Sequence, residues 1–212
     1  MQRPYIGIEG PIGVGKTTLA NYLGERLQAE QMLEVFEENP FLAKFYDDPE
    51  CYALQTQLFF LMSRYRQHER LRDDGSPLVS DYIFAKNDLF ARYTLTGEEH
   101  VLYRNISETL AARLAEPTLV VYLTADLDVL MGRIEQRGRE YEQGQSMRDY
   151  MRKLTGQYHT FFADYTAAPV LTINTTQVNV VDDAAARRKI LDHITGEFEH
   201  LLAGRPTQKP LL

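Results

Sequence analysis

The stretch Gly10-Pro11-Ile12-Gly13-Val14-Gly15-Lys16-Thr17-Thr18 decides the fold of this chain. It is a complete G-x-x-x-x-G-K-T motif, which follows the apolar run 5–8 and precedes a proline-free run. Glycines let successive backbone N–H groups converge on phosphate oxygens, Lys16 reaches the outer phosphates, and the Thr17 hydroxyl is placed to bind Mg²⁺. A tight strand-to-helix turn is the alternative. Because the lysine and the hydroxyl coincide with the turn, the motif predicts a site for a nucleoside triphosphate and Mg²⁺.

Composition narrows the kind of partner. The chain has 212 residues and a net charge of −7, which argues against a broad nucleic-acid surface and favours a nucleotide as a small ligand. Its single cysteine, Cys51, cannot form an intramolecular disulfide, and the N-terminus runs into the first strand without a signal peptide. No apolar run is long enough to cross a membrane. We therefore expect a cytoplasmic protein.

Short apolar runs alternate with helical stretches along the chain. Continuous apolar runs suit strands that are buried on both faces of a parallel sheet. The pattern predicts an α/β, P-loop kinase-like fold with three layers: a five-stranded parallel sheet with helices on both faces. We expect a single domain over 1–203 and a loose tail over 204–212. The predicted strands are 5–8, 33–36, 77–80, 118–123 and 170–173, and the predicted helices are 17–29, 49–71, 84–115, 126–137, 146–165 and 182–202.

Acidic residues follow several of the predicted strands. Ligands of open α/β sheets lie beyond the carboxyl ends of the strands, so these acids are expected at the same edge as the phosphate loop. Glu37 or Glu38 could accept a proton from an acceptor hydroxyl, or orient it, and Asp81 could hold Mg²⁺ opposite Thr17. The alternatives are solvated turn residues or helix caps.

Arginines gather near residue 135. Arg133 and Arg137 are one helical turn apart, and Gly138 then lets Arg139 swing on a flexible segment. Such spacing predicts an arginine-bearing lid over about 134–147, which brings guanidinium groups to the transferring phosphate. A solvated helix face is the alternative. Gln55 lies off the leucine stripe of its helix, so its amide could pair with a base edge, although a glutamine on a helix is more often a surface residue.

Five phrases in fixed order resemble the deoxynucleoside kinase family, specifically its bacterial deoxyguanosine and deoxyadenosine kinase branch. They are IEGPIGVGKTTL (8–19), EENPFLAKFYDDP (37–49), LQTQLFFLMSRY (54–65), SDYIFAKN (80–87) and RIEQRGREYE (133–142). The resemblance implies an ATP-dependent kinase that phosphorylates the 5′-hydroxyl of a purine 2′-deoxynucleoside. It implies that Glu37, or Glu38, takes the hydroxyl proton, that Tyr46 and Glu142 hold the 3′-hydroxyl, and that Gln55 pairs with the base. Arg133, Arg137 and Arg139 match the lid arginines.

One position departs from the family pattern. Many members carry an arginine after the acid that ends the third strand, whereas this chain reads Asp81-Tyr82. Tyr82 could substitute through a hydrogen bond, or a nearby cation such as Lys86 or Arg64 could do so. The Asp-Tyr phrase followed by Lys-Asn is more similar to deoxyguanosine kinases, which favours a guanine substrate. As in relatives, long helices within 52–71 and 98–115 would pair in a homodimer.

Two other functions share part of this pattern. A thymidylate-type nucleoside monophosphate kinase has a similar phosphate loop and lid, but it needs extra arginines in the acceptor pocket, where acids at 37–38 favour a neutral nucleoside. A nucleotide-binding switch could use the same loop. Guanine-nucleotide switches typically carry an Asn-Lys-x-Asp base reader, and the sequence has none.

Overall fold

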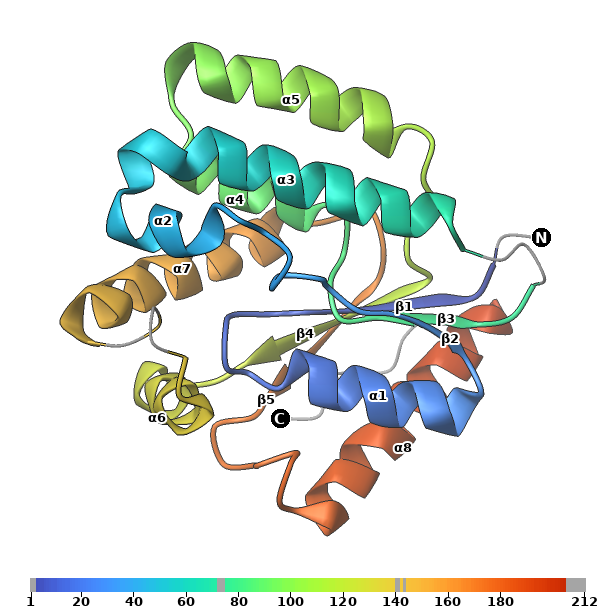
Figure 1. Cartoon of the computed structure of the whole chain (residues 1–212). Helices are drawn as coiled ribbons and strands as arrows, with labels where there is room; N and C mark the ends of the chain where they lie inside the picture. Colours follow the sequence, from blue (N-terminus) through green and yellow to red (C-terminus); the bar gives the residue numbers. More distant parts are fainter. Residues whose placement is uncertain (1–2, 72–74, 140–141, 143, 205–212) are drawn as a thin grey trace.

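The apolar run before the glycine-rich motif forms β1 (Tyr5–Glu9), the central strand of a five-stranded parallel sheet (Figure 1). This computed structural model describes residues 3–71, 75–139, 142 and 144–204. The sheet order is β2-β3-β1-β4-β5, and every residue of β1 is buried. The other strands are β2 (Glu30–Met32), β3 (Leu78–Ser80), β4 (Leu119–Thr124) and β5 (Val170–Asn174). The sheet confirms the predicted fold class.

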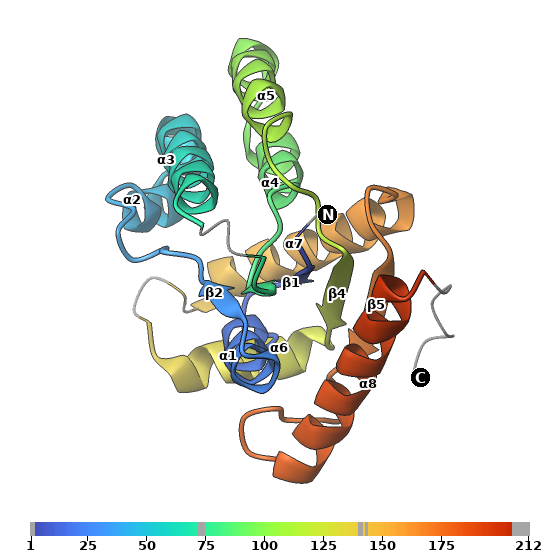
Figure 2. The same cartoon turned by 90° about the vertical axis from the view of Figure 1, so that its right-hand side faces the viewer.

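Helices cover both faces of the sheet. Figures 1 and 2 show α1 (Lys16–Leu27) and α8 (Ala184–Leu202) on one face. On the other face lie α3 (Pro49–Glu69), α4 (Lys86–Thr94), α5 (Gly97–Ala111) and α7 (Gly144–Asp164). The short α2 (Leu42–Asp47) precedes α3, and α6 (Leu127–Arg137) lies near the carboxyl end of β4. The side chain of Asp48 caps α3 by accepting a hydrogen bond from the backbone N–H of Cys51.

The second strand differs from its prediction. It ends at Met32, and residues 33–36 form irregular backbone instead of the predicted strand. Side chains satisfy the backbone there: Gln67 donates to the Leu33 carbonyl at 2.6 Å, and the Glu34 N–H donates to Asp81 Oδ1 at 2.7 Å. The chain therefore leaves the sheet earlier than its apolar pattern indicates.

The predicted helix 84–115 is two helices. It breaks between α4 and α5, where Gly97 has a φ of +56°, a conformation that favours glycine. The predicted lid, 134–147, spans the end of α6 and the start of α7, and 140, 141 and 143 lie outside the described residues. So does 205–212 of the predicted tail. No described helix is long and apolar enough to cross a membrane.

Candidate active site

The glycine-rich loop connects β1 to α1 at the carboxyl edge of the sheet. Gly10, Gly13 and Gly15 have φ angles of 149°, 82° and 103°. A Cβ at Gly10 would lie 2.3 Å from the carbonyl oxygen of Leu123, so a side chain cannot fit there. The loop therefore keeps a backbone path that exposes N–H groups ahead of α1, which is a favourable arrangement for an anion.

Lys16 begins α1 and turns back over the loop. Its Nζ donates to the carbonyls of Gly10 and Pro11 at 2.7 and 3.1 Å. Burial and the nearby ammonium of Lys86 lower the pKa of Lys16 to about 8. An anion bound at the loop would stabilise the charged form of this lysine.

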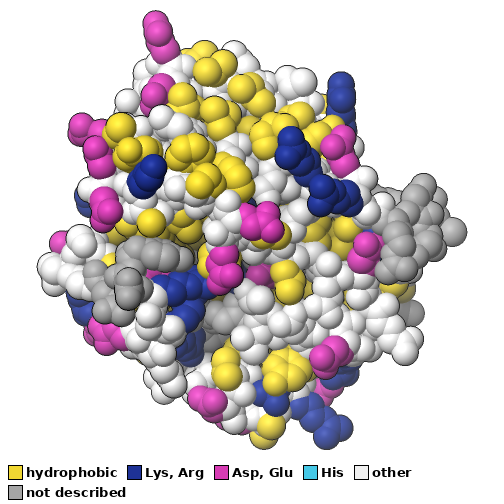
Figure 3. All heavy atoms as spheres, in the orientation of Figure 1, with side chains coloured by type: hydrophobic (Ala, Val, Ile, Leu, Met, Phe, Trp, Pro, Cys, Tyr) yellow, Lys and Arg dark blue, Asp and Glu magenta, His cyan; other side chains and the backbone are white. Residues whose placement is uncertain are grey.

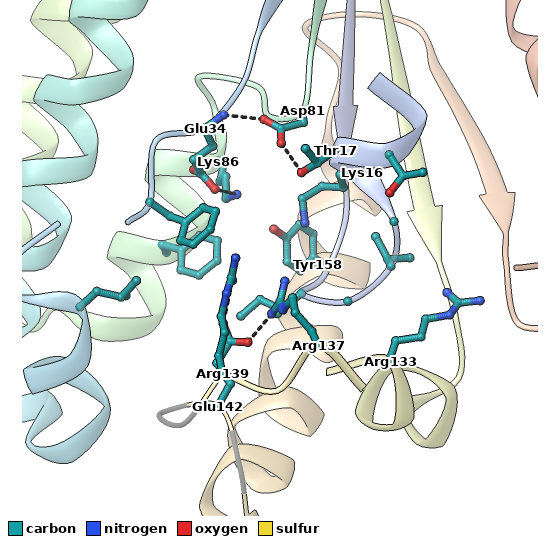
Figure 4. A pocket seen from close by; sticks show the side chains of 18 of the residues that line it. Lys16, Thr17, Glu34, Asp81, Lys86, Arg133, Arg137, Arg139, Glu142 and Tyr158 are labelled. Atoms are coloured by element: carbon teal, nitrogen blue, oxygen red, sulfur yellow. Dashed lines mark hydrogen bonds and ion pairs between the residues drawn. The ribbon is translucent and has the colours of Figure 1, made fainter. Parts of the chain in front are cut away.

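Thr17 and Asp81 meet across the sheet edge, as expected. The Thr17 hydroxyl donates to Asp81 Oδ2 at 2.5 Å (Figure 4). Burial and the charge of Glu34 raise the pKa of Asp81. A hydroxyl and a carboxylate beside a phosphate loop are oxygen ligands of the kind that Mg²⁺ takes, so the residues present fit this ion.

Glu34, which the sequence analysis missed, supplies a carboxylate to the wall of the pocket. Arg64 donates to its Oε1 from Nε at 2.8 Å and from Nη2 at 2.5 Å, and Lys86 donates to its Oε2 at 3.0 Å. Burial favours the neutral acid, but the two cations outweigh it and hold the pKa of Glu34 well below its usual value. Figure 4 shows Glu34 and Lys86 across a gap from Lys16.

Glu37 and Glu38 lie elsewhere. Both are exposed, and neither is among the described residues that line the pocket. Their prediction depended on a strand ending at residue 36, whereas β2 ends at Met32. One signal could have pointed to Glu34: it is the only charged residue within the apolar run 33–36, and a carboxylate there needs a partner or a function.

The glutamine that lines the pocket is not the one that the sequence predicted. Gln55 is exposed and does not line the pocket, whereas Gln57 is 2% exposed and does. Among the residues that the structure describes, Gln57 Oε1 and the hydroxyl of its neighbour Thr56 have no hydrogen-bond partner. Buried polar atoms of this kind at the wall of a cavity can form hydrogen bonds with a bound molecule.

All three arginines predicted for the lid border the pocket, and two of them, Arg137 and Arg139, point into it. Arg137 forms an ion pair with Glu142, and Arg139 donates to the same carboxylate at 3.3 Å. Arg139 also stacks 3.9 Å from the ring centroid of Phe36. Figure 4 shows both guanidinium groups directed toward the gap before Lys16. Glu142 is 3% exposed and therefore depends on these charges.

Arg133 is engaged differently. Its guanidinium donates to the Thr175 hydroxyl at 3.1 Å and to the carbonyls of Thr175 and Val178 at 2.8 and 2.9 Å. The residue borders the pocket, but Figure 4 shows its guanidinium turned away from Lys16. Arg133 therefore supports the loop that follows β5 rather than the space between Lys16 and Glu34.

The remaining predicted residues divide in the same way. Tyr46 and Lys86 line the pocket. Tyr82 is fully buried, is absent from the described lining, and donates from its hydroxyl to Gln67 Oε1 at 2.9 Å. Tyr82, Lys86 and Arg64 were the candidates to replace the missing arginine, and two of them, Lys86 and Arg64, contact Glu34. Together the loop, Glu34, Gln57 and the lid surround a pocket of about 580 Å³.

The sequence matches a family of known proteins. The family model described as deoxynucleoside kinase matches residues 6–199. A deoxyguanosine kinase of Bacillus subtilis is 38% identical over 177 residues, which cover 81% of this chain and 85% of that protein. A deoxyadenosine/deoxycytidine kinase of the same organism is 30% identical, with 89% and 90% covered.

The fold is similar to solved structures. A deoxyadenosine kinase from M. mycoides with products dCMP and a flexible dCDP bound has a TM-score of 0.76 at 20% identity, covering 93% of this chain and 99% of that one. The same enzyme with bound dATP has a TM-score of 0.73 at 20% identity, covering 90% and 100%. The match to the family model over nearly the whole chain decides the assignment. This chain belongs to the deoxynucleoside kinase family.

Proposed function

We propose that the chain transfers the γ-phosphate of ATP to the 5′-hydroxyl of a purine 2′-deoxynucleoside, with deoxyguanosine preferred over deoxyadenosine. The observation that carries the proposal is the carboxylate of Glu34, held by Arg64 and Lys86 across the pocket from Lys16. A hydroxyl group can donate a hydrogen bond to such a carboxylate, whereas an ionised acceptor phosphate has no proton to donate to it. The acceptor is therefore a nucleoside.

On the donor side, the loop 10–18 would hold the phosphates of ATP, and Lys16 would contact the outer ones. Thr17 and Asp81 would hold Mg²⁺, directly or through water. When bound, this ion neutralises charge on the phosphates. Lys16, Thr17 and the loop N–H groups orient the donor so that its terminal phosphate faces the acceptor.

On the acceptor side, we assign the carboxylate role to Glu34 in place of Glu37 and Glu38. Its lowered pKa makes it a weak base, so its main contribution is to orient the hydroxyl and to receive its proton late in the reaction. Phosphoryl transfer has a loose transition state, for which alignment and charge neutralisation matter most.

Base and sugar contacts complete the acceptor site. We assign base pairing to Gln57 in place of Gln55, because its buried amide oxygen lacks a partner among the described residues. Tyr46 and Glu142 would hold the 3′-hydroxyl. Arg137 and Arg139 would exchange part of their contact with Glu142 for the transferring phosphate when the lid closes.

Two observations support the remaining parts of the proposal. The preference for guanine follows the higher identity to a deoxyguanosine kinase, 38%, than to a deoxyadenosine/deoxycytidine kinase, 30%. A homodimer through α3 and α5 is supported by the exposed apolar residues Met62, Val101 and Leu102, the last of them 51% exposed. Figure 3 shows apolar side chains gathered where Figure 1 draws these helices. We place the reaction in the cytoplasm, where ATP is supplied.

Separation of reaction products tests the proposal. Purified protein is incubated with Mg-ATP and each of the four deoxynucleosides, and in parallel with the four deoxynucleoside monophosphates. We expect deoxyguanosine 5′-monophosphate to form fastest, followed by deoxyadenosine 5′-monophosphate. Turnover of a monophosphate, with none of any nucleoside, would instead identify a nucleoside monophosphate kinase.

A further inference from the structure

Lys86, at the start of α4, has its ammonium group buried between two carboxylates. The residue is 5% exposed, and its Nζ lies 3.0 Å from Glu34 Oε2 and 3.9 Å from Glu9 Oε1. A buried ammonium group is costly unless it is paired, so this position requires an explanation. Either carboxylate could be the group that Lys86 serves.

Glu9 has other partners. It is fully buried, and its carboxylate accepts hydrogen bonds from the N–H of Gly10 at 2.8 Å, the N–H of Ile83 at 3.3 Å and the hydroxyl of Tyr158 at 2.9 Å. These three donors remain if the lysine is removed. Glu34 is therefore the carboxylate that depends on Lys86.

Glu34 is held from two directions. Arg64, on α3, donates two hydrogen bonds to Oε1, from Nε and Nη2, and its Nη1 donates to the side chain of Asn87. Lys86, on α4, donates a hydrogen bond to the other oxygen, Oε2. With Arg64 only, the carboxylate could rotate about its last bond and turn Oε2 away from the pocket. With both cations its plane is fixed.

We propose that Lys86 is a positioning residue that fixes Glu34 Oε2 for the acceptor hydroxyl. This inference rests on the proposed function, because it assumes that Glu34 faces the acceptor. Tyr82 occupies the position at which many family members carry an arginine. Its hydroxyl donates to Gln67, and the residue lies outside the described lining of the pocket. The side-chain partners of Glu34 are Arg64 and Lys86, and we assign Tyr82 a role in packing.

A positioning role predicts a particular kinetic effect. Misplacement of a reacting group by about 1 Å costs on the order of 100-fold in rate, while contacts to base and sugar are unaffected. Lys86→Met keeps an unbranched apolar side chain and removes the ammonium group. It should therefore lower kcat on the order of 100-fold and change KM for the nucleoside less than about threefold. Lys86→Arg should restore kcat at least tenfold over the methionine variant.

The effect should also depend on Glu34. In a Glu34→Gln background, Lys86→Met should lower kcat little further, since the carboxylate that the lysine positions is already lost. Lys153→Met, an exposed lysine on α7, is the matched control and should behave like the wild type. If Lys86 only stabilised the fold, its replacement would lower the unfolding temperature and leave kcat of the folded protein unchanged.

Clear outcomes would overturn the inference. If the wild type is active and Lys86→Met keeps its kcat, or if the losses from Lys86→Met and Glu34→Gln are fully additive, Lys86 does not act through Glu34. A kcat loss in Tyr82→Phe with a normal Lys86→Met would assign the role to Tyr82. Should Lys86→Met fail to fold, Lys86→Gln and Lys86→Arg give the same comparison of neutral and charged groups. An inactive wild type would count against the proposed function instead.

Discussion

Replacement of Gln57 by methionine removes a buried amide and keeps the length of the side chain. Gln57 is 2% exposed, and its Oε1 has no hydrogen-bond partner among the described residues, so the amide is free to bond a base edge. Loss of such a bond, with a polar base group left unsatisfied, costs about 1–3 kcal/mol. At about 1.4 kcal/mol for each factor of ten, KM for the nucleoside should rise roughly 5- to 140-fold.

The matched control is Gln55→Met, two residues away on the same helix. Gln55 is exposed and outside the pocket lining, so its replacement should leave KM unchanged. Both variants are assayed by initial rates against deoxyguanosine at saturating Mg-ATP, together with KM for ATP, which neither should change. A rise in KM for Gln55→Met with none for Gln57→Met would refute the assignment of the base contact. Equal effects would refute it too.

Two further predictions concern the phosphate loop and a buried histidine. Lys16→Ala should lower kcat on the order of 1000-fold with an unchanged circular dichroism spectrum, because it removes a cation at the transferring phosphate; near wild-type turnover would contradict the loop assignment. Burial lowers the pKa of His68 to about 4, whereas an unfolded histidine titrates near 6.5, so the unfolded state binds more protons as the pH falls between these values. Stability from this residue is complete above about pH 6.5, and about 2 kcal/mol of it is lost by pH 5. His68→Phe keeps the ring contacts to Tyr5, Tyr82 and Phe84. Between about pH 6.5 and pH 5, its free energy of unfolding in urea should therefore fall by about 2 kcal/mol less than that of the wild type. An equal fall in both proteins would contradict this prediction.

Sequence reasoning predicted the parts of the site that depend on local spacing. The phosphate loop must contain its glycines, Lys16 and Thr17 in a fixed order, because one short turn supplies every contact. Asp81 was predicted because it follows β3 directly, and the Thr17–Asp81 hydrogen bond joins the two as expected. The sheet and most helix bounds followed from apolar runs of ordinary length.

Positions that depend on tertiary contacts were missed. Gln67 and Asp81, from other elements, bond the backbone at 33 and 34, where β2 has already ended. The apolar run 33–36 therefore predicted a strand that does not form there, and the carboxylate that lines the pocket is Glu34 instead of Glu37 or Glu38. No local pattern contains this information, because the partners are more than thirty residues away in sequence.

The side of helix α3 that faces the pocket was also missed, for a related reason. Leu54, Leu58 and Leu61 predict its buried face, and Gln55 lies off that stripe. The structure buries Leu61 but leaves Leu54 and Leu58 half-buried, and it also buries Ala53, Thr56, Gln57, Phe60 and Arg64. Because polar side chains are part of the buried face of this helix, its leucine pattern does not identify the side that faces the pocket.

The most direct test of the central claim compares kcat for Glu34→Gln and Glu38→Gln with deoxyguanosine and Mg-ATP. The glutamine keeps the shape of the side chain and removes its charge, and Glu38 is exposed beyond the pocket. We predict that Glu34→Gln lowers kcat about 10²- to 10⁴-fold, whereas Glu38→Gln keeps wild-type kcat. A normal kcat for Glu34→Gln, or a large loss confined to Glu38→Gln, would contradict the account.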